Sequence, residues 1–258
     1  MDSPLQIERH DSSQIWTINL PHLGNAITEP GFLDALDLAV DAANGDETVT
    51  AVILTGQGKI FSAGGNVKEM AERRGMFALD PVSQRRAYID GIQRVPRAID
   101  RLEMPIIGAI NGGAIGAGCD LAMMCDIRIA SERAFFAESF VQIGLIPGDG
   151  GSWFLPRAVG YERAAEMTFT GDRVDAGTAQ QWGMVSDVVP HEDLLRAATA
   201  LAGRIGKNPG HAVRMAKRLL QESRTSRLDT VLGMAAAMQP LAHQHPEHES
   251  RLAKWRTS

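Results

Sequence analysis

The sequence predicts an α/β fold with parallel strands, on the basis of three observations. Two apolar runs, Val49–Thr55 and Pro105–Ile110, are rich in β-branched residues, as is typical of strands buried on both faces. Two other segments, Phe32–Ala43 and Arg85–Leu102, carry apolar residues at helical spacing. The two kinds of segment alternate along the chain, and such alternation favours parallel pairing through right-handed crossovers.

The N-terminal part is predicted to begin with a hairpin. Leu5–Arg9 and Gln14–Asn19 are short strand-like runs on either side of the polar turn His10–Ser13. After the first buried strand, Asn66 has the features of a helix N-cap, because Glu69 follows three residues later as in a capping box. A helix is therefore expected to start after Asn66.

The middle of the chain repeats this alternation. Pro96 lies inside the helical pattern of Arg85–Leu102 and is expected to kink or split that helix. A glycine-rich turn, Gly112–Gly118, then leads from the second buried strand into an apolar helix, Cys119–Met124. Two further strands are expected at Asp126–Ala130 and Ala134–Ala137.

From Tyr161 onward the chain is predicted to be mainly helical, with one short strand at Val185–Val189. We expect an α/β core over residues 1–190 and a helical C-terminal region over residues 191–258; a single uniform domain is the open alternative. The expected helices are Tyr161–Phe169, Ala176–Trp182, Glu192–Ile205, Gly210–Glu222 and Leu228–His243.

Composition narrows the class of protein. The 258 residues include 26 Lys and Arg against 31 Asp and Glu, a net charge of −5, which argues against a general nucleic-acid binder. Two cysteines, Cys119 and Cys125, are too few for a disulfide framework and suit a reducing compartment. The first ten residues contain no apolar stretch of the kind found in signal peptides. The expectation is a cytoplasmic protein without membrane segments.

Glycine is in excess, with 26 residues against about 18 expected from a usage of roughly 7%. Several lie in two stretches, Phe61–Asn66 and Asn111–Asp120, where a buried strand ends and a helix begins. Small residues there let a ligand approach the backbone, and the first N–H groups of a helix lack partners. Two such helix starts facing each other would offer two donors to one oxyanion. The alternative is tight packing of helix on strand.

Other site motifs are incomplete. The dinucleotide pattern that begins at Gly116 has Leu121 where its third glycine belongs. His243, His245 and His248 lie near Glu247, but no H-E-x-x-H spacing is present. These histidines are interpreted as a solvated helix start, and no metal site is expected.

Four stretches together resemble the crotonase (enoyl-CoA hydratase/isomerase) superfamily: Gly58–Met70, Asn111–Arg128, Gly144–Gly151 and Phe169–Val185. They cover most of the chain up to Val189 and occur in the family's order. The resemblance implies an α/β crotonase-like spiral of stacked β-β-α turns with a C-terminal helical trimerisation region. It also implies an acyl-CoA thioester substrate, a place in fatty acid metabolism, and a homotrimer or a hexamer made of two trimers.

The resemblance also assigns binding residues. The oxyanion hole maps onto the backbone N–H groups of Gly65 and Ala117, which agrees with the two facing helix starts. The CoA moiety would contact Ala63, Gly65, Lys68 and Ala117, although Lys68 is almost as well explained as a solvated helix lysine. No cofactor beyond the CoA of the substrate is expected.

The carboxylates depart from the hydratase pattern. Asp120 matches the first of the two glutamates of typical hydratases, but Phe140 occupies the position of the second. Asp149 lies one residue beyond an aspartate used by some isomerases of the family, and Glu138 precedes Phe140 by two residues. Asp120 and Asp149 are the predicted proton-transfer residues, with Glu138 as a weaker candidate. Their alternatives are a helix-start aspartate, a turn aspartate and a surface glutamate.

Two activities remain open: hydration of an enoyl-CoA and isomerisation of its double bond. A phenyl ring at the second glutamate position cannot activate water, whereas one or two aspartates can move a proton between the α and γ carbons. The alternative outside enzymology is an acyl-CoA-binding or RNA-binding relative with little or no catalysis. The acidic charge balance argues against RNA.

Overall fold

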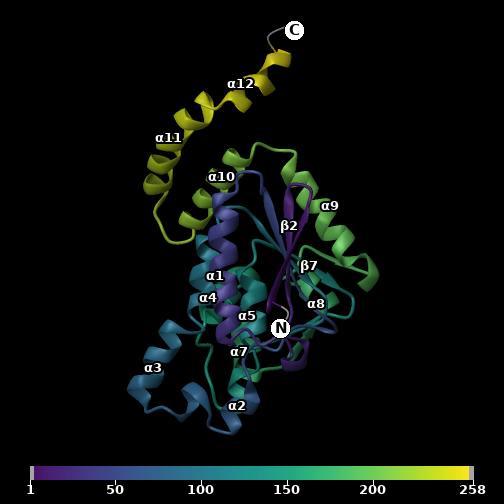
Figure 1. Cartoon of the computed structure of the whole chain (residues 1–258), viewed down its shortest axis with the longest axis vertical. Helices are drawn as coiled ribbons and strands as arrows, with labels where there is room; N and C mark the ends of the chain where they lie inside the picture. The colour runs from purple at the N-terminus through teal and green to yellow at the C-terminus, as the bar shows by residue number, and fades with distance from the viewer. Residues whose placement is uncertain (1–2, 256–258) are drawn as a thin grey trace.

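The computed structural model describes residues 3–255, which form two sheets flanked by helices (Figure 1). The larger sheet has six strands in the order β1-β2-β3-β5-β7-β10, parallel throughout except for the antiparallel β1–β2 hairpin. The predicted parallel pairing and the N-terminal hairpin are therefore confirmed. The strands are β1 Leu5–His10, β2 Ser13–Ile18, β3 Ala51–Gly56, β5 Ile106–Ile110, β7 Ile127–Ser131 and β10 Asp187–Val189.

A smaller four-stranded sheet has the order β4-β6-β8-β9, with only β9 antiparallel. Its strands are β4 Ile60–Ser62, β6 Gly113–Ile115, β8 Phe135–Ala137 and β9 Arg173–Asp175. The sequence predicts β6 as part of a turn, because its glycines are poor strand formers. Pairing with β4 on one side and β8 on the other overrides that local preference.

The helices cover both faces of the larger sheet. Its alternate residues Val52 and Leu54 belong to the core beneath α1, α4 and α5, while Ala51 and Ile53 pack against α9. The helices are α1 Pro30–Gly45, α2 Val67–Ala71, α3 Pro81–Asp90, α4 Arg94–Arg101, α5 Ala117–Met124, α6 Gly151–Val159, α7 Tyr161–Thr170, α8 Ala176–Gln181, α9 Leu194–Gly206, α10 Gly210–Glu222, α11 Leu228–Gln244 and α12 Pro246–Leu252. Short 3-10 turns are η1 Pro21–Leu23, η2 Gly75–Ala78, η3 Ser139–Ile143, η4 His191–Asp193 and η5 Ala253–Trp255.

Two helical details differ from expectation. The pattern over Arg85–Leu102 is split, but the break lies at Gly91–Gln93 and not at Pro96, which sits in the first turn of α4. A proline in the first turn of a helix loses no intrahelical hydrogen bond, so α4 accommodates Pro96 without breaking. Helix α6 is not among the predicted elements, since paired glycines at its start and Pro156 inside it obscure the helical pattern.

The first two C-terminal helices, α9 and α10, pack on the rest of the protein. Leu194, Ala198 and Ala202 of α9 pack against the larger sheet. On α10, the buried Lys217 Nζ donates to the Met104 carbonyl and pairs with Asp126, both at 2.9 Å. The division between the α/β core and the C-terminal region at residue 190 stays a prediction.

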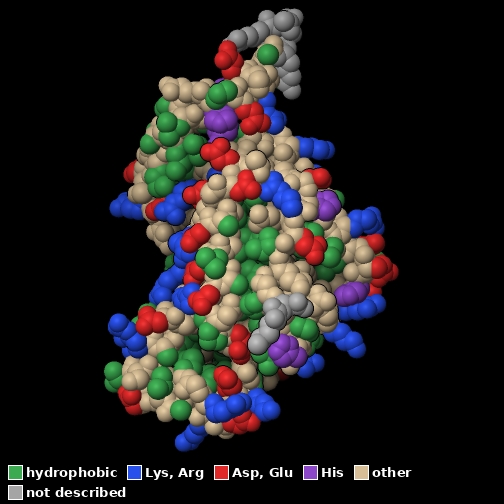
Figure 2. All heavy atoms as spheres, viewed as in Figure 1, with side chains coloured by type: hydrophobic (Ala, Val, Ile, Leu, Met, Phe, Trp, Pro, Cys, Tyr) green, Lys and Arg blue, Asp and Glu red, His purple; other side chains and the backbone are tan. Residues whose placement is uncertain are grey.

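Helices α11 and α12 extend away from the rest of the molecule, at the top of Figure 1. None of the α11 residues is buried, and Leu228, Leu232 and Leu241 are 72%, 55% and 62% exposed. Hydrophobic side chains accordingly gather over α11 in the space-filling view (Figure 2). Among residues 3–255, no helix has the length and apolar character that a membrane crossing needs.

Candidate active site

The two glycine-rich junctions of the sequence meet in space. Gly64 follows β4, Gly116 follows β6, and these neighbouring strands deliver both loops to one place. Gly64 and Gly116 have φ angles of +78° and +53°, which side-chain-bearing residues adopt only with strain. A Cβ atom on Gly64 would lie 2.7 Å from the Ala117 nitrogen, so only glycine lets the loops approach this closely.

Polar side chains hold the two loops in place. The Ser62 hydroxyl accepts the Gly64 N–H at 3.0 Å and donates to the Asn25 carbonyl at 2.8 Å. The Asn111 side chain accepts the Gly56 N–H at 3.1 Å and donates to the Gly58 carbonyl at 2.9 Å. Because these bonds are buried or half-buried, they fix the backbone before any ligand arrives.

The loops present two backbone donors. Ala117 is the first residue of α5, so its N–H has no acceptor within the helix. Among residues 3–255, neither the Gly65 N–H nor the Ala117 N–H donates a hydrogen bond to another residue. The arrangement can therefore bind one oxyanion from two sides. Its use by a thioester oxygen stays a prediction.

Three carboxyl groups are buried beside these donors. Asp120 in the first turn of α5, Glu138 after β8 and Asp149 before α6 are 0%, 1% and 3% exposed. Both oxygens of Asp120 and Glu138, and Oδ2 of Asp149, have no hydrogen-bond partner among the described residues. The Asp120 carboxyl lies against Gly151, a position where any side chain would collide with it. The structure thus brings together all three carboxylates singled out in the sequence.

The surroundings of the cluster raise the pKa of all three carboxyl groups. Burial, followed by the charge of Glu138, raises the pKa of Asp120 well above its usual range. Burial, followed by the charge of Asp120, does the same to the pKa of Asp149, and burial also raises the pKa of Glu138. No described Lys or Arg forms an ion pair with the cluster. The neutral form of each carboxyl is therefore favoured, and a carboxyl group with a raised pKa can donate a proton or, once ionised, accept one.

The apolar ring of Phe140 lies next to the two glycine-rich loops. A Cβ atom on Gly116 would lie 3.6 Å from Cζ of Phe140, so the ring packs beside the residue that precedes Ala117. Phe140 is half-buried and packs against the main core. An apolar surface therefore lies where the resemblance places the second hydratase glutamate.

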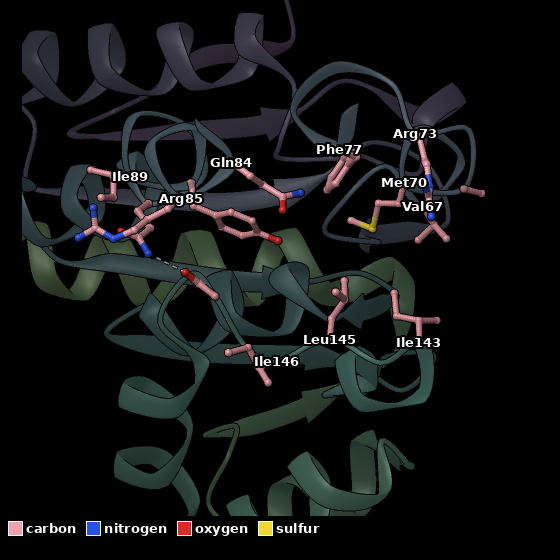
Figure 3. A pocket seen from close by; sticks show the side chains of 14 residues that line it. Val67, Met70, Arg73, Phe77, Gln84, Arg85, Ile89, Ile143, Leu145 and Ile146 are labelled. Carbon is pink, nitrogen blue, oxygen red and sulfur yellow. Dashed lines mark hydrogen bonds between the residues drawn. The ribbon is translucent and has the colours of Figure 1, made fainter. Parts of the chain in front are cut away.

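A pocket of about 960 Å³ opens next to these groups (Figure 3). Its mostly apolar walls come from α2 and η2 on one side, α3 on another, and the end of η3 with the segment after it on the third. The lining residues are Val67, Met70, Ala71, Arg73, Phe77, Gln84, Arg85, Tyr88, Ile89, Gln93, Ile143, Leu145, Ile146 and Gly148.

Contacts connect the pocket to both ends of the site. Met70 lies over Gly65, since its Cε atom would be 2.8 Å from a Cβ atom placed there. Tyr88 packs against Gly148. Burial and, to a smaller extent, the charge of Asp149 raise the pKa of Tyr88. Gln93 donates to the Gly148 carbonyl at 3.0 Å and fixes that loop. The pocket therefore borders Gly65 at one end and the loop of Gly148 and Asp149 at the other.

The remaining predicted residues lie at the edge of the site. Lys68 is exposed on α2, and Ala63 is half-buried with its N–H bonded to the Gly24 carbonyl at 2.8 Å. Their contacts to CoA stay predictions. Tyr88 is the residue that the sequence interpretation missed, because nothing local links a tyrosine in a helix to a loop sixty residues later.

Comparison with known proteins gives a consistent result. The family model described as enoyl-CoA hydratase/isomerase matches residues 10–254. A probable mitochondrial enoyl-CoA hydratase from Dictyostelium discoideum is 38% identical over 207 residues, which are 80% of this chain and 71% of that protein. A crotonyl-CoA hydratase from Syntrophomonas wolfei is 36% identical over 231 residues, which are 89% of this chain and 86% of the relative.

The fold is shared as well. The crystal structure of an enoyl-CoA hydratase from Mycobacterium smegmatis superposes with a TM-score of 0.90 at 30% identity, covering 99% of this chain and 97% of the other. The predicted crotonase-like α/β fold is thereby confirmed. The match of sequence model, relatives and fold over nearly the whole chain shows that this protein belongs to the enoyl-CoA hydratase/isomerase family.

Proposed function

We propose that this protein acts on an unsaturated acyl-CoA thioester through an enolate held at the N–H groups of Gly65 and Ala117. The observation that carries the proposal is a cluster of three buried carboxyl groups directly beside two backbone donors that have no acceptor among residues 3–255. Enolate formation places negative charge on the thioester oxygen, and fixed donors stabilise that charge where it develops. The neighbouring carboxylates then move the proton.

Asp120 and Asp149 are the proposed proton-transfer residues. In double-bond isomerisation, one carboxylate removes a proton from the α or γ carbon, and the electron pair moves into a dienolate on the thioester oxygen. A carboxyl group then returns a proton to the other carbon, so that the product has the composition of the substrate. No water is consumed, and two neighbouring carboxyl groups can supply both roles, one as the base and one as the acid.

Isomerisation is the first candidate because of Phe140. Syn hydration by two glutamates needs a second carboxylate that orients water, and the phenyl ring beside Gly116 cannot do this. The three buried carboxyls lie close enough to influence one another's pKa. A proton removed from the substrate can therefore stay on this cluster until it is returned to the product.

Hydration is the second candidate, favoured by a separate observation. The relatives described above carry the name hydratase, and one from Escherichia coli, 32% identical, is a 2,3-dehydroadipyl-CoA hydratase. In that case Asp149 or Glu138 would take the part of the missing glutamate and bind the attacking water.

The pocket suggests the size of the acyl group. About 960 Å³ is near the upper end of small-molecule sites, and most of the lining is apolar. We infer that the acyl chain is longer or bulkier than a four-carbon crotonyl group. A chain that enters past Met70 would place its first carbons between Gly65 and Asp149.

The deciding experiment uses a panel of 2-enoyl-CoA and 3-enoyl-CoA thioesters of short, medium and branched acyl groups. Mass spectrometry of the products separates the candidates, since hydration adds one water and isomerisation leaves the mass unchanged while the double bond shifts. The expected result is an unchanged mass with a moved double bond, most rapid for medium-length chains. A gain of one water would establish hydration instead.

The same incubation in deuterated water tests for the non-catalytic alternative. An enolate-forming enzyme exchanges the α protons of a saturated acyl-CoA even where no net reaction is possible. Tight binding of acyl-CoA without exchange, hydration or isomerisation would mean that the protein is a binding relative only.

We further propose that α11 and α12 contact other copies of the chain in a trimer or a hexamer. The support is the row of exposed leucines on α11, since a surface helix with no buried residues gains little stability from its own chain. Analytical ultracentrifugation is expected to give a multiple of three chains. A monomer at micromolar concentration would contradict this part of the proposal.

A further inference from the structure

A cluster of metal-ligating side chains lies where α10, α11 and α12 meet, outside the carboxyl cluster and the pocket. His211 belongs to the first turn of α10, His245 joins α11 to α12, and Glu247 lies in the first turn of α12. All three are half-buried. One ligand atom from each lies within 4.8 Å of the other two. The rings of His211 and His245 are stacked, with centroids 3.6 Å apart.

The cluster retains unused binding capacity. Nδ1 of His211 is buried and has no hydrogen-bond partner among the described residues. Nδ1 of His245 accepts the Glu247 N–H at 3.3 Å, which is long for a hydrogen bond. Glu247 uses one carboxylate oxygen, Oε1, to pair with Arg251 at 3.0 Å. A buried imidazole nitrogen without a partner is costly, and a ligand would satisfy it.

We propose that His211, His245 and Glu247 bind one divalent transition-metal ion of the zinc class. Two imidazoles and one carboxylate are a common set of three zinc ligands, with a fourth position left for water. Ligand atoms around a tetrahedral zinc lie roughly 3.3 Å apart, as follows from metal–ligand distances of about 2.0–2.1 Å. To reach this spacing from within 4.8 Å, the rings of His211 and His245 must turn out of their stack, because the lone pairs of imidazole nitrogens lie in the ring planes.

Metal binding would replace local contacts of His245 with a bond to the ion. A neutral imidazole has a single free lone pair, so His245 must give up the bond that caps α12 when it ligates the ion. In return the ion would connect the start of α10 to the start of α12, adding a second link to the one between Arg251 and the Lys207 carbonyl. The ion would therefore fix the orientation of the exposed C-terminal helices.

The sequence alone does not point to this site. The tract of His243, His245 and His248 lacks a metal-binding spacing, and His211 lies thirty-four residues before His245. Only the path of α11 brings His211 against His245. The neighbouring pair, His243 and His248, bond each other at 3.1 Å and lie outside the proposed ligand set.

The test uses the full chain without an affinity tag, stripped of metal with a chelator. Isothermal titration with Zn²⁺ and visible absorption with Co²⁺ are expected to show one ion per chain in a site with nitrogen and oxygen ligands. His211→Ala and His245→Ala are each expected to weaken binding at least about tenfold. Zn²⁺ is expected to raise the Tm of the unmodified chain but of neither variant.

Two controls make the result specific. His22→Ala changes an exposed histidine on η1 and is expected to leave the affinity for Zn²⁺ unchanged. His243→Ala is also expected to leave it unchanged, because His243 is not a proposed ligand. His211→Gln keeps a polar side chain and should lose the metal while circular dichroism stays that of the unmodified protein.

Three outcomes would overturn the proposal. These are no binding of Zn²⁺ or Co²⁺ at millimolar concentration, undiminished binding by His211→Ala, and loss of binding in His243→Ala to the same degree as in His245→Ala. The last would mean that the ion is held loosely by the exposed histidine tract. None of these outcomes bears on the proposed reaction of acyl-CoA thioesters, since the site is separate from it.

Discussion

Gly64 lies directly against the backbone nitrogen of Ala117, and a Cβ atom on Gly64 would come within 2.7 Å of it. The same atom would also lie 2.7 Å from the Ile115 carbonyl oxygen and 3.0 Å from the Gly118 nitrogen. Because Gly64 has no side chain, the two loops that carry the proposed oxyanion donors can lie next to each other.

Gly64→Ala is expected to lower kcat by about 10² to 10³, as does the loss of one oxyanion donor in other enzymes. The added methyl group must push the two loops apart, which displaces the Ala117 N–H from the substrate oxygen. The measurement is turnover of the best enoyl-CoA from the panel, with acyl-CoA affinity measured in parallel.

Gly160→Ala is the matched control for this substitution. Gly160 also has a positive φ, +81°, but a Cβ atom there would meet nothing within 4 Å. Both variants carry backbone strain, whereas only Gly64→Ala creates a collision. An equal loss of turnover in the two variants would show that strain alone matters and would remove Gly64 from the oxyanion argument.

Asp120→Asn and Asp149→Asn are each expected to lower kcat by about 10² to 10⁴, the usual contribution of a positioned acid or base. An amide keeps the size of the side chain but does not transfer a proton. Asp172→Asn, at an exposed residue between α7 and β9, is the control and should turn over normally. Full activity in both test variants would eliminate the proposed pair.

The buried carboxyl cluster is expected to make stability fall as pH rises. Because the folded pKa values of Asp120, Glu138 and Asp149 are raised, the native protein keeps protons that the unfolded chain releases. The native state is therefore favoured most below the unfolded pKa values of about 4, and this advantage is lost as pH rises from there toward the folded values.

Glu138→Gln isolates this contribution, because the amide stays neutral at every pH. The difference in Tm between the variant and the unmodified protein should grow in favour of the variant between about pH 4 and the raised folded pKa. Thermal melts at several pH values measure it, with Asp172→Asn as the reference for exposed carboxyls. A difference in Tm that is independent of pH would contradict a raised pKa of Glu138 in the folded protein.

Phe140→Glu is expected to shift the products toward hydration. The new carboxyl would lie beside Gly116, where it can orient water toward the double bond held at the neighbouring donors. We expect the hydrated share of product, read by mass spectrometry, to rise at least several-fold. Phe140→Gln removes the ring without adding a base, and an equal rise in that variant would assign the effect to lost packing.

The local patterns that the sequence predicts well are those in which neighbouring residues decide the structure. Asn66 is the N-cap of α2, as expected, and accepts the Glu69 N–H at 3.3 Å. Helix α10 has its predicted bounds, Gly210–Glu222. Strand β3 is buried over its whole length because both faces are covered by helices, which its unbroken apolar run indicates.

Elements that depend on distant partners were harder to predict. Strand β6 exists because β4 and β8 flank it, although its own sequence favours a turn. The break between α3 and α4 falls at Gly91, where the chain changes direction, while Pro96 is accommodated in the first turn of α4. For β6 tertiary contacts outweigh the local preference. The place of the helix break follows a local rule instead, because a proline in the first turn of a helix loses no intrahelical hydrogen bond.

The family, the two glycine junctions and the candidate carboxylates Asp120, Asp149 and Glu138 follow from the sequence alone, because motif spacing and residue chemistry are local properties. Three relationships are visible only in the folded chain: Glu138 joins the other two carboxyls, Tyr88 lies beside Asp149, and His211 stacks on His245. These relationships arise from segments far apart in the chain, and the energies that govern them, burial and charge in a low-dielectric interior, exist only after those segments have packed together.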